Sequence, residues 1–249
     1  MGHPGSMIFQ PFFYPATGCA SYLVGCGGKG IAAVIDPQLE DVDAYIAAAE
    51  AKGMRIAYVI DTHIQADHRS GGRVLAERTG GRYALHRDAQ VGFPFEPLED
   101  GQLIELGNVV VRVLHTPGHT AESICLVVTD RRRGEEPWFV LTGDTLFVGT
   151  VGRPDLPGTM ERSARDLYRS LQRLLALPDH TEIYPTHFSG SACGKGMSGK
   201  PMSTMGFEKR FNPALAIASE DAFVAALTAE LPPKPAGMEA MLRQNQGRV

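Results

Sequence analysis

Cysteine is scarce in this sequence, long apolar runs are absent, and neither sign of charge dominates. The four cysteines form no CxxC pair and no dense framework, which excludes a disulfide-stapled secreted scaffold and favours a reducing cytoplasm. No apolar run approaches the roughly 20 residues that span a bilayer. Lys and Arg total 24 against 28 Asp and Glu, and no stretch gathers enough basic residues to follow a phosphate backbone. We therefore expect neither a membrane nor a nucleic acid as a partner.

The chain has enough apolar residues to bury a sizeable core, because 43% of its 249 residues belong to that class. Residues 1–6 lack the charged and apolar regions of a secretory signal, and they resemble an expression scar that ends before Met7. No linker rich in Pro and Gly divides the remainder. We therefore expect one domain over residues 7–249, in a chain whose formal net charge is −4.

Strand-type and helix-type patterns alternate along the chain in two similar blocks. The strands are expected at Met7–Tyr14, Ala20–Val24, Ile31–Ile35, Arg55–Ile60, Tyr83–His86, Val109–His115, Ser123–Thr129, Trp138–Leu141 and Thr181–Tyr184. The helices are expected at Asp41–Lys52, about Arg69–Thr79 and Glu161–Leu177, with a C-terminal helical region over 219–249 that contains Ser219–Leu231 and Met238–Gln246. Two β-rich halves with helices outside them predict an α/β fold, a four-layer α/β/β/α sandwich.

Polar segments that contain His and Asp follow several of the expected strands. Strand ends are where an α/β protein places its functional site. Imidazole and carboxylate groups are the usual ligands of first-row metals. One histidine near a turn is more often a hydrogen-bonded or capping residue, but four in such positions indicate a metal centre. The ligand-type residues of these segments are His63, Asp67, His68, His119, Asp144 and His187.

These segments resemble, in order and in their flanking Gly and Pro, the signature of the metallo-β-lactamase superfamily, whose usual first motif is HxHxDH. The resemblance extends over nearly the whole chain and implies the same sandwich fold. One position departs from the motif. Gln65 stands where the motif has its second His, and a neutral amide is a poor ligand for a transition metal.

The departure at Gln65 changes the metal site that the resemblance implies, because the first site then keeps only His63, His119 and Asp144. Two histidines and one carboxylate leave several coordination positions open on ferrous iron for dioxygen and substrate together. In two-zinc relatives such as hydroxyacylglutathione hydrolase, a second site would use Asp144 and three further residues. Those three are Asp67, His68 and His187, and the sequence leaves this second site open.

The chain also resembles the persulfide dioxygenases of this superfamily, in the bacterial form without a rhodanese domain. That resemblance implies one Fe(II) per chain, with Zn(II) as the alternative metal, in a protein of the bacterial cytoplasm. The most discriminating match is Gly152-Arg153-Pro154-Asp155, because the metal motifs are shared with hydrolases. The other matching segments are Thr62-His63, Ala66-Asp67-His68, Ser70-Gly71, Thr116–Thr120, Thr142–Leu146, Ile183–His187 and Asn212-Pro213.

The same resemblance implies roles for residues around the metal. The substrate would be glutathione persulfide or a related low-molecular-weight persulfide, which O2 would oxidise to sulfite with release of the thiol. Asp67 and His68 would orient ligands or relay protons. Arg153 would pair with a substrate carboxylate, and Tyr184 would donate a hydrogen bond at the iron. The residues themselves also allow a structural ion pair for Arg153 and a core position for Tyr184.

Residues 188–206 form a glycine-rich segment without periodicity, which predicts a long loop that is either functional or disordered. This loop contains Cys193, close in sequence to Lys195. A lowered thiol pKa would let Cys193 bind substrate or relay sulfane sulfur, and a loop thiol without a role is the alternative.

We interpret the sequence as that of a non-haem iron persulfide dioxygenase. Two other classes of protein stay open. A two-zinc glutathione thioester hydrolase of the glyoxalase II type would use the second site, and a non-catalytic sulfur carrier or sensor would use Cys193. The sequence also leaves a homodimer open.

Overall fold

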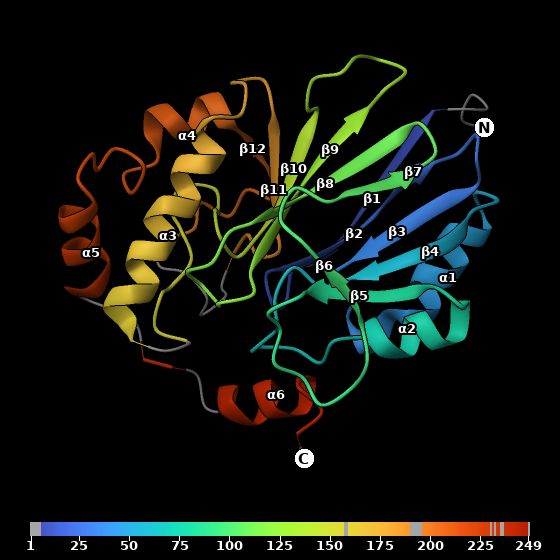
Figure 1. Cartoon of the computed structure of the whole chain (residues 1–249), viewed down its shortest axis with the longest axis horizontal. Coiled ribbons are helices and arrows are strands. Elements are labelled where there is room, and N and C mark those ends of the chain that lie inside the picture. The colour runs from blue at the N-terminus through green and yellow to red at the C-terminus, as the bar shows by residue number, and fades with distance from the viewer. Residues whose placement is uncertain are drawn as a thin grey trace.

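The computed structural model describes residues 6–156, 159–189, 196–229, 231, 233–234 and 237–248. Within these residues two mixed β-sheets pack face to face, and helices cover both outer faces (Figure 1). Helices α1 and α2 lie on the right of this view, whereas α3, α4 and α5 lie on the left. This arrangement confirms the predicted α/β/β/α sandwich. No helix of the described part of the chain is both long and apolar enough to cross a membrane.

The first sheet is built from the N-terminal half of the chain. Its first three strands form the expected antiparallel meander, and β3 to β6 run parallel to one another. The sequence patterns did not predict β6, a three-residue edge strand that contains Pro97; an edge tolerates the missing N–H of proline. In order across the sheet the strands are β1 (Met7–Tyr14), β2 (Cys19–Cys26), β3 (Ile31–Ile35), β4 (Arg55–Ile60), β5 (Arg82–His86) and β6 (Glu96–Leu98).

The second sheet is antiparallel except for the pair β10 and β11. Two of its strands were not predicted. One is the edge strand β7, and the other is β12, which lies inside the segment 188–206 and pairs with β11. The prediction of an irregular loop therefore fails at the end of that segment. In order across the sheet the strands are β12 (Ser203–Thr204), β11 (Glu182–Pro185), β10 (Phe139–Gly143), β9 (Ile124–Asp130), β8 (Val109–His115) and β7 (Leu103–Leu106).

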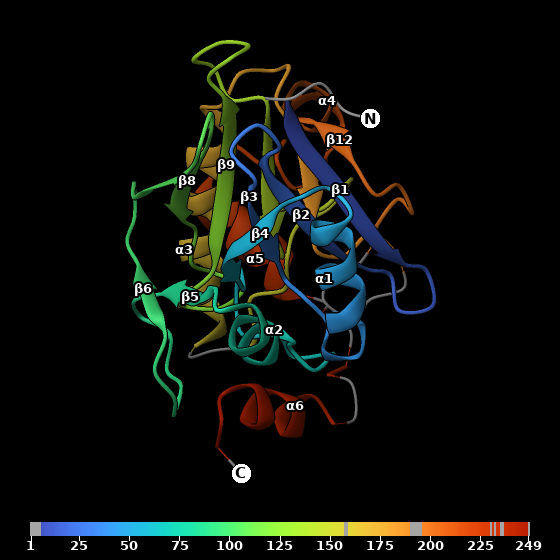
Figure 2. The same cartoon turned by 90° about the vertical axis from the view of Figure 1, so that its right-hand side faces the viewer.

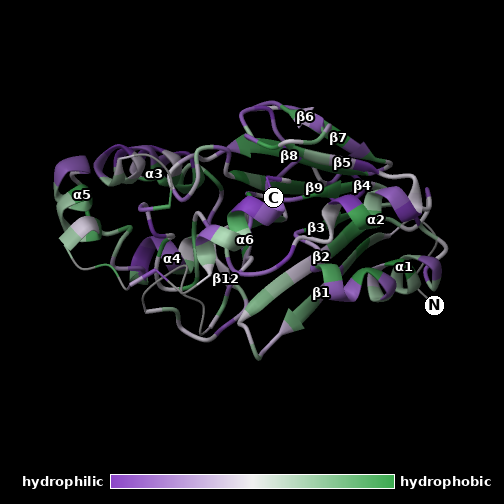
Figure 3. Ribbon diagram, turned by 90° about the horizontal axis from the view of Figure 1, so that it is seen from below, coloured by the Kyte–Doolittle hydropathy of each residue, from purple (hydrophilic) through white to green (hydrophobic). Residues whose placement is uncertain are grey.

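The helices carry both polar and apolar residues, so Figure 3 shows them in mixed colours, and α3 buries an apolar stripe. In α3 Leu167, Leu171 and Leu174 are buried against the second sheet, and α4 is a helix that the sequence patterns did not predict. Helix α6 lies below the sheets in Figures 1 and 2, at the C-terminal end. The helices are the 3-10 turn η1 (Leu39–Asp41), α1 (Val42–Glu50), α2 (Gly72–Thr79), α3 (Met160–Leu175), α4 (Met205–Phe211), α5 (Glu220–Ala229) and α6 (Met238–Asn245).

The main core lies between the two sheets, where alternate residues of facing strands meet. Val24 and Ile35 come from the first sheet, and Val111, Leu126 and Leu141 come from the second. Full burial of one such side chain stabilises the fold by about 1.5–3 kcal/mol. The two sheets therefore form a rigid support for the loops that leave their strand ends.

Candidate metal centre

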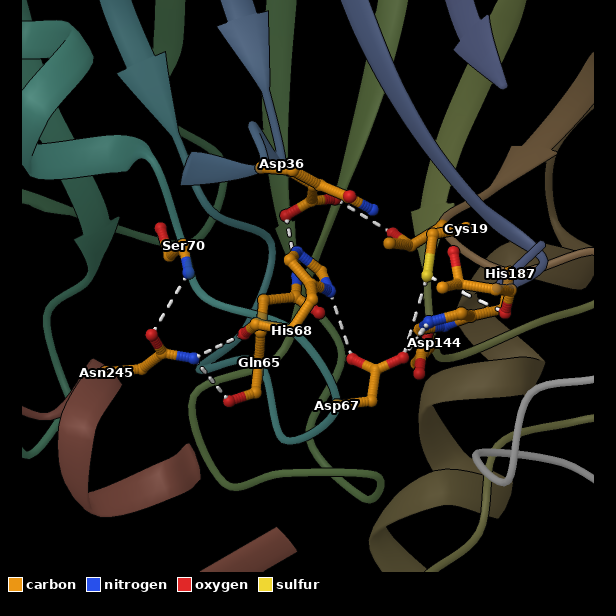
Figure 4. A network of polar contacts seen from close by, with 12 residues as sticks. Cys19, Asp36, Gln65, Asp67, His68, Ser70, Asp144, His187 and Asn245 are labelled. Carbon is orange, nitrogen blue, oxygen red and sulfur yellow. Dashed lines mark hydrogen bonds and ion pairs between the residues drawn. The ribbon is translucent and has the colours of Figure 1, made fainter. Parts of the chain in front are cut away.

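Polar side chains from four strand ends meet at one site. The loop after β4 carries His63, the turn after β8 carries His119, and Asp144 and His187 follow β10 and β11. Strand β4 belongs to the first sheet and the others to the second, so the site joins the two halves of the sandwich. Figure 4 shows the part of this site around Asp144 and His187.

The three residues predicted to bind iron converge on one point. His63 Nε2 lies 3.7 Å and His119 Nε2 lies 3.4 Å from Asp144 Oδ2, and all three side chains are buried. Among the described residues, His119 Nε2 and Asp144 Oδ2 have no hydrogen-bond partner. Buried polar atoms without a partner are costly, and these separations suit ligands that share one ion at about 2.0–2.2 Å. The three side chains therefore fit a metal ion.

Hydrogen bonds at the far side of each ring orient the two histidines. His63 Nδ1 lies 3.0 Å from Thr62 Oγ1, and His119 Nδ1 lies 3.0 Å from the carbonyl oxygen of Arg153. Because a carbonyl oxygen only accepts, His119 Nδ1 carries the proton and Nε2 keeps its lone pair. Such partners fix the tautomer that a metal requires.

The protonation states also suit metal binding. Burial lowers the pKa of His63 to about 3 and also lowers the pKa of His119, so both rings are neutral near pH 7. Burial opposes ionisation of Asp144, but the charge of His187 and its hydrogen bond outweigh burial and hold the pKa of Asp144 well below its usual range. Neutral imidazole and ionised carboxylate are the forms that bind a metal.

Behind the triad, His187 connects Asp144 to Asp67. His187 Nδ1 lies 2.7 Å from Asp144 Oδ1, and its Nε2 lies 2.6 Å from Asp67 Oδ2 (Figure 4). Both ring nitrogens meet carboxylates, an arrangement that an imidazolium satisfies by donating to each. His68 Nδ1 lies 3.0 Å from the other oxygen of Asp67. His187 therefore orients a ligand of the triad.

Asp67 and His68 stabilise each other's ionised forms beside His187. Burial opposes ionisation of Asp67, but His187 and His68 outweigh it and hold the pKa of Asp67 well below its usual range. Burial likewise opposes the charged form of His68, but the bonds to Asp67 and Cys19 raise the pKa of His68 to about 10. These groups form an ionised pair next to the triad.

Cys19 belongs to this neighbourhood although sequence reasoning did not single it out. Its Sγ lies 3.7 Å from Asp67 Oδ2, and an isolated β-bridge pairs Cys19 with His187. Ligand atoms of Cys19, Asp67, His68 and His187 all lie within 4.8 Å of one another. No sequence signal marks Cys19, because it is the first residue of an apolar strand and only the bridge brings it to the site.

Gln65 is buried and directed to Asp36. Its Nε2 donates to Asp36 Oδ1 over 3.1 Å, and the same carboxylate accepts hydrogen bonds from Thr62 and Thr186. Burial, together with the charge of Asp61, raises the pKa of Asp36 to about 7. Asp36 was not predicted as part of the site. It ties the loop after β4 to the loop after β11.

Arg153 supports the triad through its backbone. Its side chain is buried and forms a bidentate ion pair with Asp155, at 2.7 and 2.9 Å, which is one of the alternatives left open for this residue. Gly152 allows the close approach of this segment, because an added Cβ would lie 1.9 Å from the backbone oxygen of Asp144. Contact between Arg153 and a substrate stays a prediction.

Tyr184 lies in the core between the sheets, and a contact between its hydroxyl and a substrate stays a prediction. Its hydroxyl donates to Glu182 Oε2 over 2.7 Å, and its ring packs in the core against Phe9 and Phe139. Residues two apart on a strand share a face, so the position of Glu182 could have indicated this contact. The hydroxyl that was expected to meet the substrate is thus used by Glu182, and the core alternative fits.

Cys193 lies outside the described residues.

A third group of ligand-type residues, His86, Asp88 and His115, lies at the ends of β5 and β8. There the two imidazole rings stack with centroids 3.8 Å apart. His115 Nε2 also lies 2.9 Å from the carbonyl oxygen of Ala121, so the ring is already hydrogen-bonded.

Comparisons with known proteins agree with this geometry. Residues 14–187 match the family described as the Metallo-beta-lactamase superfamily. The chain is 34% identical over 215 residues to a probable metallo-hydrolase of Burkholderia pseudomallei, which covers 73% of this chain and 72% of that protein. It also matches a beta-lactamase hydrolase-like protein of Xylella fastidiosa at 31% identity over 86% of this chain, and it spans about half of that protein, 54%.

Two further similarities are to proteins named ETHE1, one of which is named a persulfide dioxygenase. The chain is 28% identical to the mitochondrial persulfide dioxygenase ETHE1 of Bos taurus, over 94% of this chain and 86% of that protein. The crystal structure of ETHE1 from Myxococcus xanthus superposes with a TM-score of 0.83 at 30% identity, covering 98% of this chain and all, 100%, of that one.

Proposed function

The chain belongs to the metallo-β-lactamase superfamily, and on that premise we propose that it is a persulfide dioxygenase. Its substrate in this proposal is glutathione persulfide or a related low-molecular-weight persulfide. One ferrous ion would be held by His63, His119 and Asp144. The similarity to the persulfide dioxygenase ETHE1 along most of both chains supports the proposal.

The observation that carries the proposal is the ligand set of the triad. Two neutral imidazoles and one carboxylate present buried, converging atoms, and a weakly coordinating amide occupies position 65. His187 meets a carboxylate with each ring nitrogen, and in this arrangement it supports Asp144 as a ligand of one ion. When bound to such a triad, ferrous iron supplies adjacent open positions that a persulfide sulfur and dioxygen can both occupy.

The overall reaction balances without a further oxidant. One persulfide RSSH, one O2 and one water give one thiol RSH and one sulfurous acid, which ionises to sulfite. The S–S bond breaks, the terminal sulfur is oxidised, and both oxygen atoms of O2 are reduced. A net release of protons follows from ionisation of the product.

The protein groups hold the ligands and the charge in place. Thr62 and the carbonyl oxygen of Arg153 fix the two imidazole rings, and His187 fixes Asp144. The carboxylate of the triad is ionised before any metal arrives, so little reorganisation is needed on binding. Asp67 holds the outer proton of His187 at Nε2.

The direct test measures oxygen uptake and sulfite in one sample. Protein prepared without oxygen and loaded with Fe(II) is given glutathione persulfide, and we expect equal amounts of O2 consumed and sulfite formed. Zinc-loaded protein is the control and should consume no oxygen. Iron-loaded protein that binds metal but consumes no oxygen with several persulfides would contradict the proposal.

A two-metal thioester hydrolase is the second candidate. The cluster of Cys19, Asp67, His68 and His187 favours it, as does the similarity to a probable metallo-hydrolase. Two zinc ions per chain together with hydrolysis of a glutathione thioester would support this function. One metal per chain and no hydrolysis would reject it.

A further inference from the structure

Asn245, the last residue of α6, reaches the loop that carries Asp67 and His68. Its Nδ2 donates to the carbonyl oxygens of Gln65 and His68, each over 2.8 Å. Its Oδ1 accepts from the backbone N–H of Ser70 over 3.0 Å (Figure 4). One side-chain amide therefore binds three backbone groups of the segment 65–70.

The end of this segment has other backbone contacts, because the carbonyl oxygen of Arg69 accepts from the N–H of Leu39 over 2.9 Å and Ser70 pairs with Gln38 in an isolated β-bridge. Its first part depends more on Asn245. Residues 65–69 are in no helix or strand, and among the described residues the carbonyl oxygens of Gln65 and His68 accept no other hydrogen bond. Among the described residues, the exposed neighbour Gln244 forms no such hydrogen bond with the loop. Unpaired backbone groups at a partly buried site are costly, so the amide of Asn245 stabilises the path of the loop between Gln65 and His68.

The loop is connected to the metal triad by short hydrogen bonds. Asp67 holds His187 at 2.6 Å, and His187 holds Asp144 at 2.7 Å. The free oxygen of Asp144 is the one that faces His63 and His119. A displacement of the loop would therefore rotate the carboxylate that binds the metal.

We propose that Asn245 is a positioning residue of the metal centre, which fixes the loop so that Asp67 and His187 hold Asp144 in its binding orientation. The C-terminal helix is then part of the metal site. The proposal rests on the metal triad and does not depend on which reaction the protein catalyses.

Helix α6 has independent anchors, so the contribution of Asn245 can be isolated. Leu242 packs against the cluster of Ile64, Leu85 and Ala89, and the backbone N–H of Gly92 donates to the carbonyl oxygen of Gln246 over 2.8 Å. Loss of the Asn245 side chain should therefore leave the helix docked. The matched control is Gln244→Ala, at an exposed side chain on the same helix turn that, among the described residues, forms no hydrogen bond with the loop.

The test compares Co(II) binding by the full chain with Asn245→Ala, Asn245→Asp and Gln244→Ala. Asn245→Asp keeps the size and the acceptor for Ser70 but cannot donate to the two carbonyl oxygens. Loss of an outer partner of a metal ligand weakens metal affinity by roughly 10- to 100-fold, and we expect about 10-fold for both Asn245 variants. Their Co(II) absorption spectra should also change, whereas Gln244→Ala should match the original protein in both measurements.

Amide hydrogen exchange gives a second measurement that needs no variant. Coupling between two sites is reciprocal, so Co(II) binding to the original chain should slow exchange of the Ser70 amide. In Asn245→Ala, which removes the acceptor of the Ser70 N–H, that amide should exchange at least about 10-fold faster.

Two results would overturn the proposal. The first is a wild-type Co(II) affinity and spectrum in folded Asn245 variants, which would leave Asn245 only a structural role. The second is no effect of Co(II) on Ser70 exchange in the original chain, which decides the matter even if the variants fail to fold. Absence of oxygen uptake by the iron-loaded protein would count against the dioxygenase proposal alone.

Discussion

Asp144 carries more of the metal centre than any other single residue, because it is the only anion of the triad and also the partner of His187. Replacing Asp144 by Ala should weaken iron binding by more than the roughly 10- to 100-fold caused by loss of an outer partner. Metal analysis after dialysis against equal Fe(II) concentrations measures the change. The matched control is Asp88→Ala, which removes an exposed aspartate from the group of His86 and His115 and should leave the iron content unchanged. Iron retained by the Asp144 variant at the original level would remove this residue from the ligand set.

Among the elements, α3 and the turn after β8 must approach closely for His119 to reach the site. Gly118 has a φ of +144°, and an added Cβ would lie 2.4 Å from Leu167 Cβ. Gly118→Ala should therefore lower the free energy of unfolding by about 2–4 kcal/mol, from backbone strain and overpacking together. Urea denaturation measures the loss.

Gly53 offers a control that measures the cost of backbone strain without a steric clash. Gly53 has a φ of +64°, and an added Cβ there would meet nothing within 4 Å. Gly53→Ala should lower the free energy of unfolding by only about 1 kcal/mol. Equal losses for Gly53→Ala and Gly118→Ala would show that contact with α3 is not the cause.

Two strand ends, those of β5 and β8, meet through the stacked rings of His86 and His115. Burial and the charge of His115 lower the pKa of His86 to about 4. Above about pH 6.5 the ring is neutral in both the folded and the unfolded chain, so its contribution to stability is complete. As the pH falls from about 6.5 to about 4, the unfolded chain binds a proton that the folded chain does not, and stability is lost.

We expect this loss to be about 1–2 kcal/mol, less than the full shift because solvent reaches Asp88 and screens the site. Urea midpoints at about pH 7 and about pH 4.5 measure it. His86→Phe should flatten the dependence by this amount, whereas His180→Phe, at a side chain that is 55% exposed, should not. An unchanged slope in His86→Phe would contradict the assignment.

At the scale of the whole molecule, the metal site joins the two sheets, because His63 follows a strand of one and His119 and Asp144 follow strands of the other. A bound ion stabilises only the folded chain, by about 2.7 kcal/mol when the free metal is at 100 times its dissociation constant. Removal of metal by a chelator should therefore lower the unfolding temperature by roughly 5–10 °C. Scanning calorimetry of loaded and stripped protein measures this shift. Asp144→Ala should show no shift, and coincident midpoints for the original protein would contradict a metal bridge.

The sequence predicted those parts of the fold that leave a pattern among residues close together in the chain. Apolar periodicity located the long strands and α3, and polar residues after strand ends located His63, His119 and Asp144. Strand β6 contains Pro97 and β12 has two residues, so neither carries enough periodicity to be recognised. Edge pairing with a neighbouring strand forms them.

The supporting contacts of the site could not be predicted for a different reason. Asn245 is separated from Ser70 by 175 residues, and a terminal Asn has no pattern that names its partner. Cys19 meets His187 only through a β-bridge. For Tyr184 a local signal did exist, since Glu182 lies two residues away on the same face of the strand.

The long separation between Ser70 and Asn245 also orders events during protein synthesis. A ribosome that adds about 5–20 residues per second needs roughly 10–35 s after Ser70 to reach Asn245, 175 positions later. During that interval His63, Asp67 and His68 have already been made, but the amide that fixes their loop has not. The nascent chain thus exposes imidazole and carboxylate groups before their final arrangement exists. Selective metal loading therefore follows the synthesis and docking of α6.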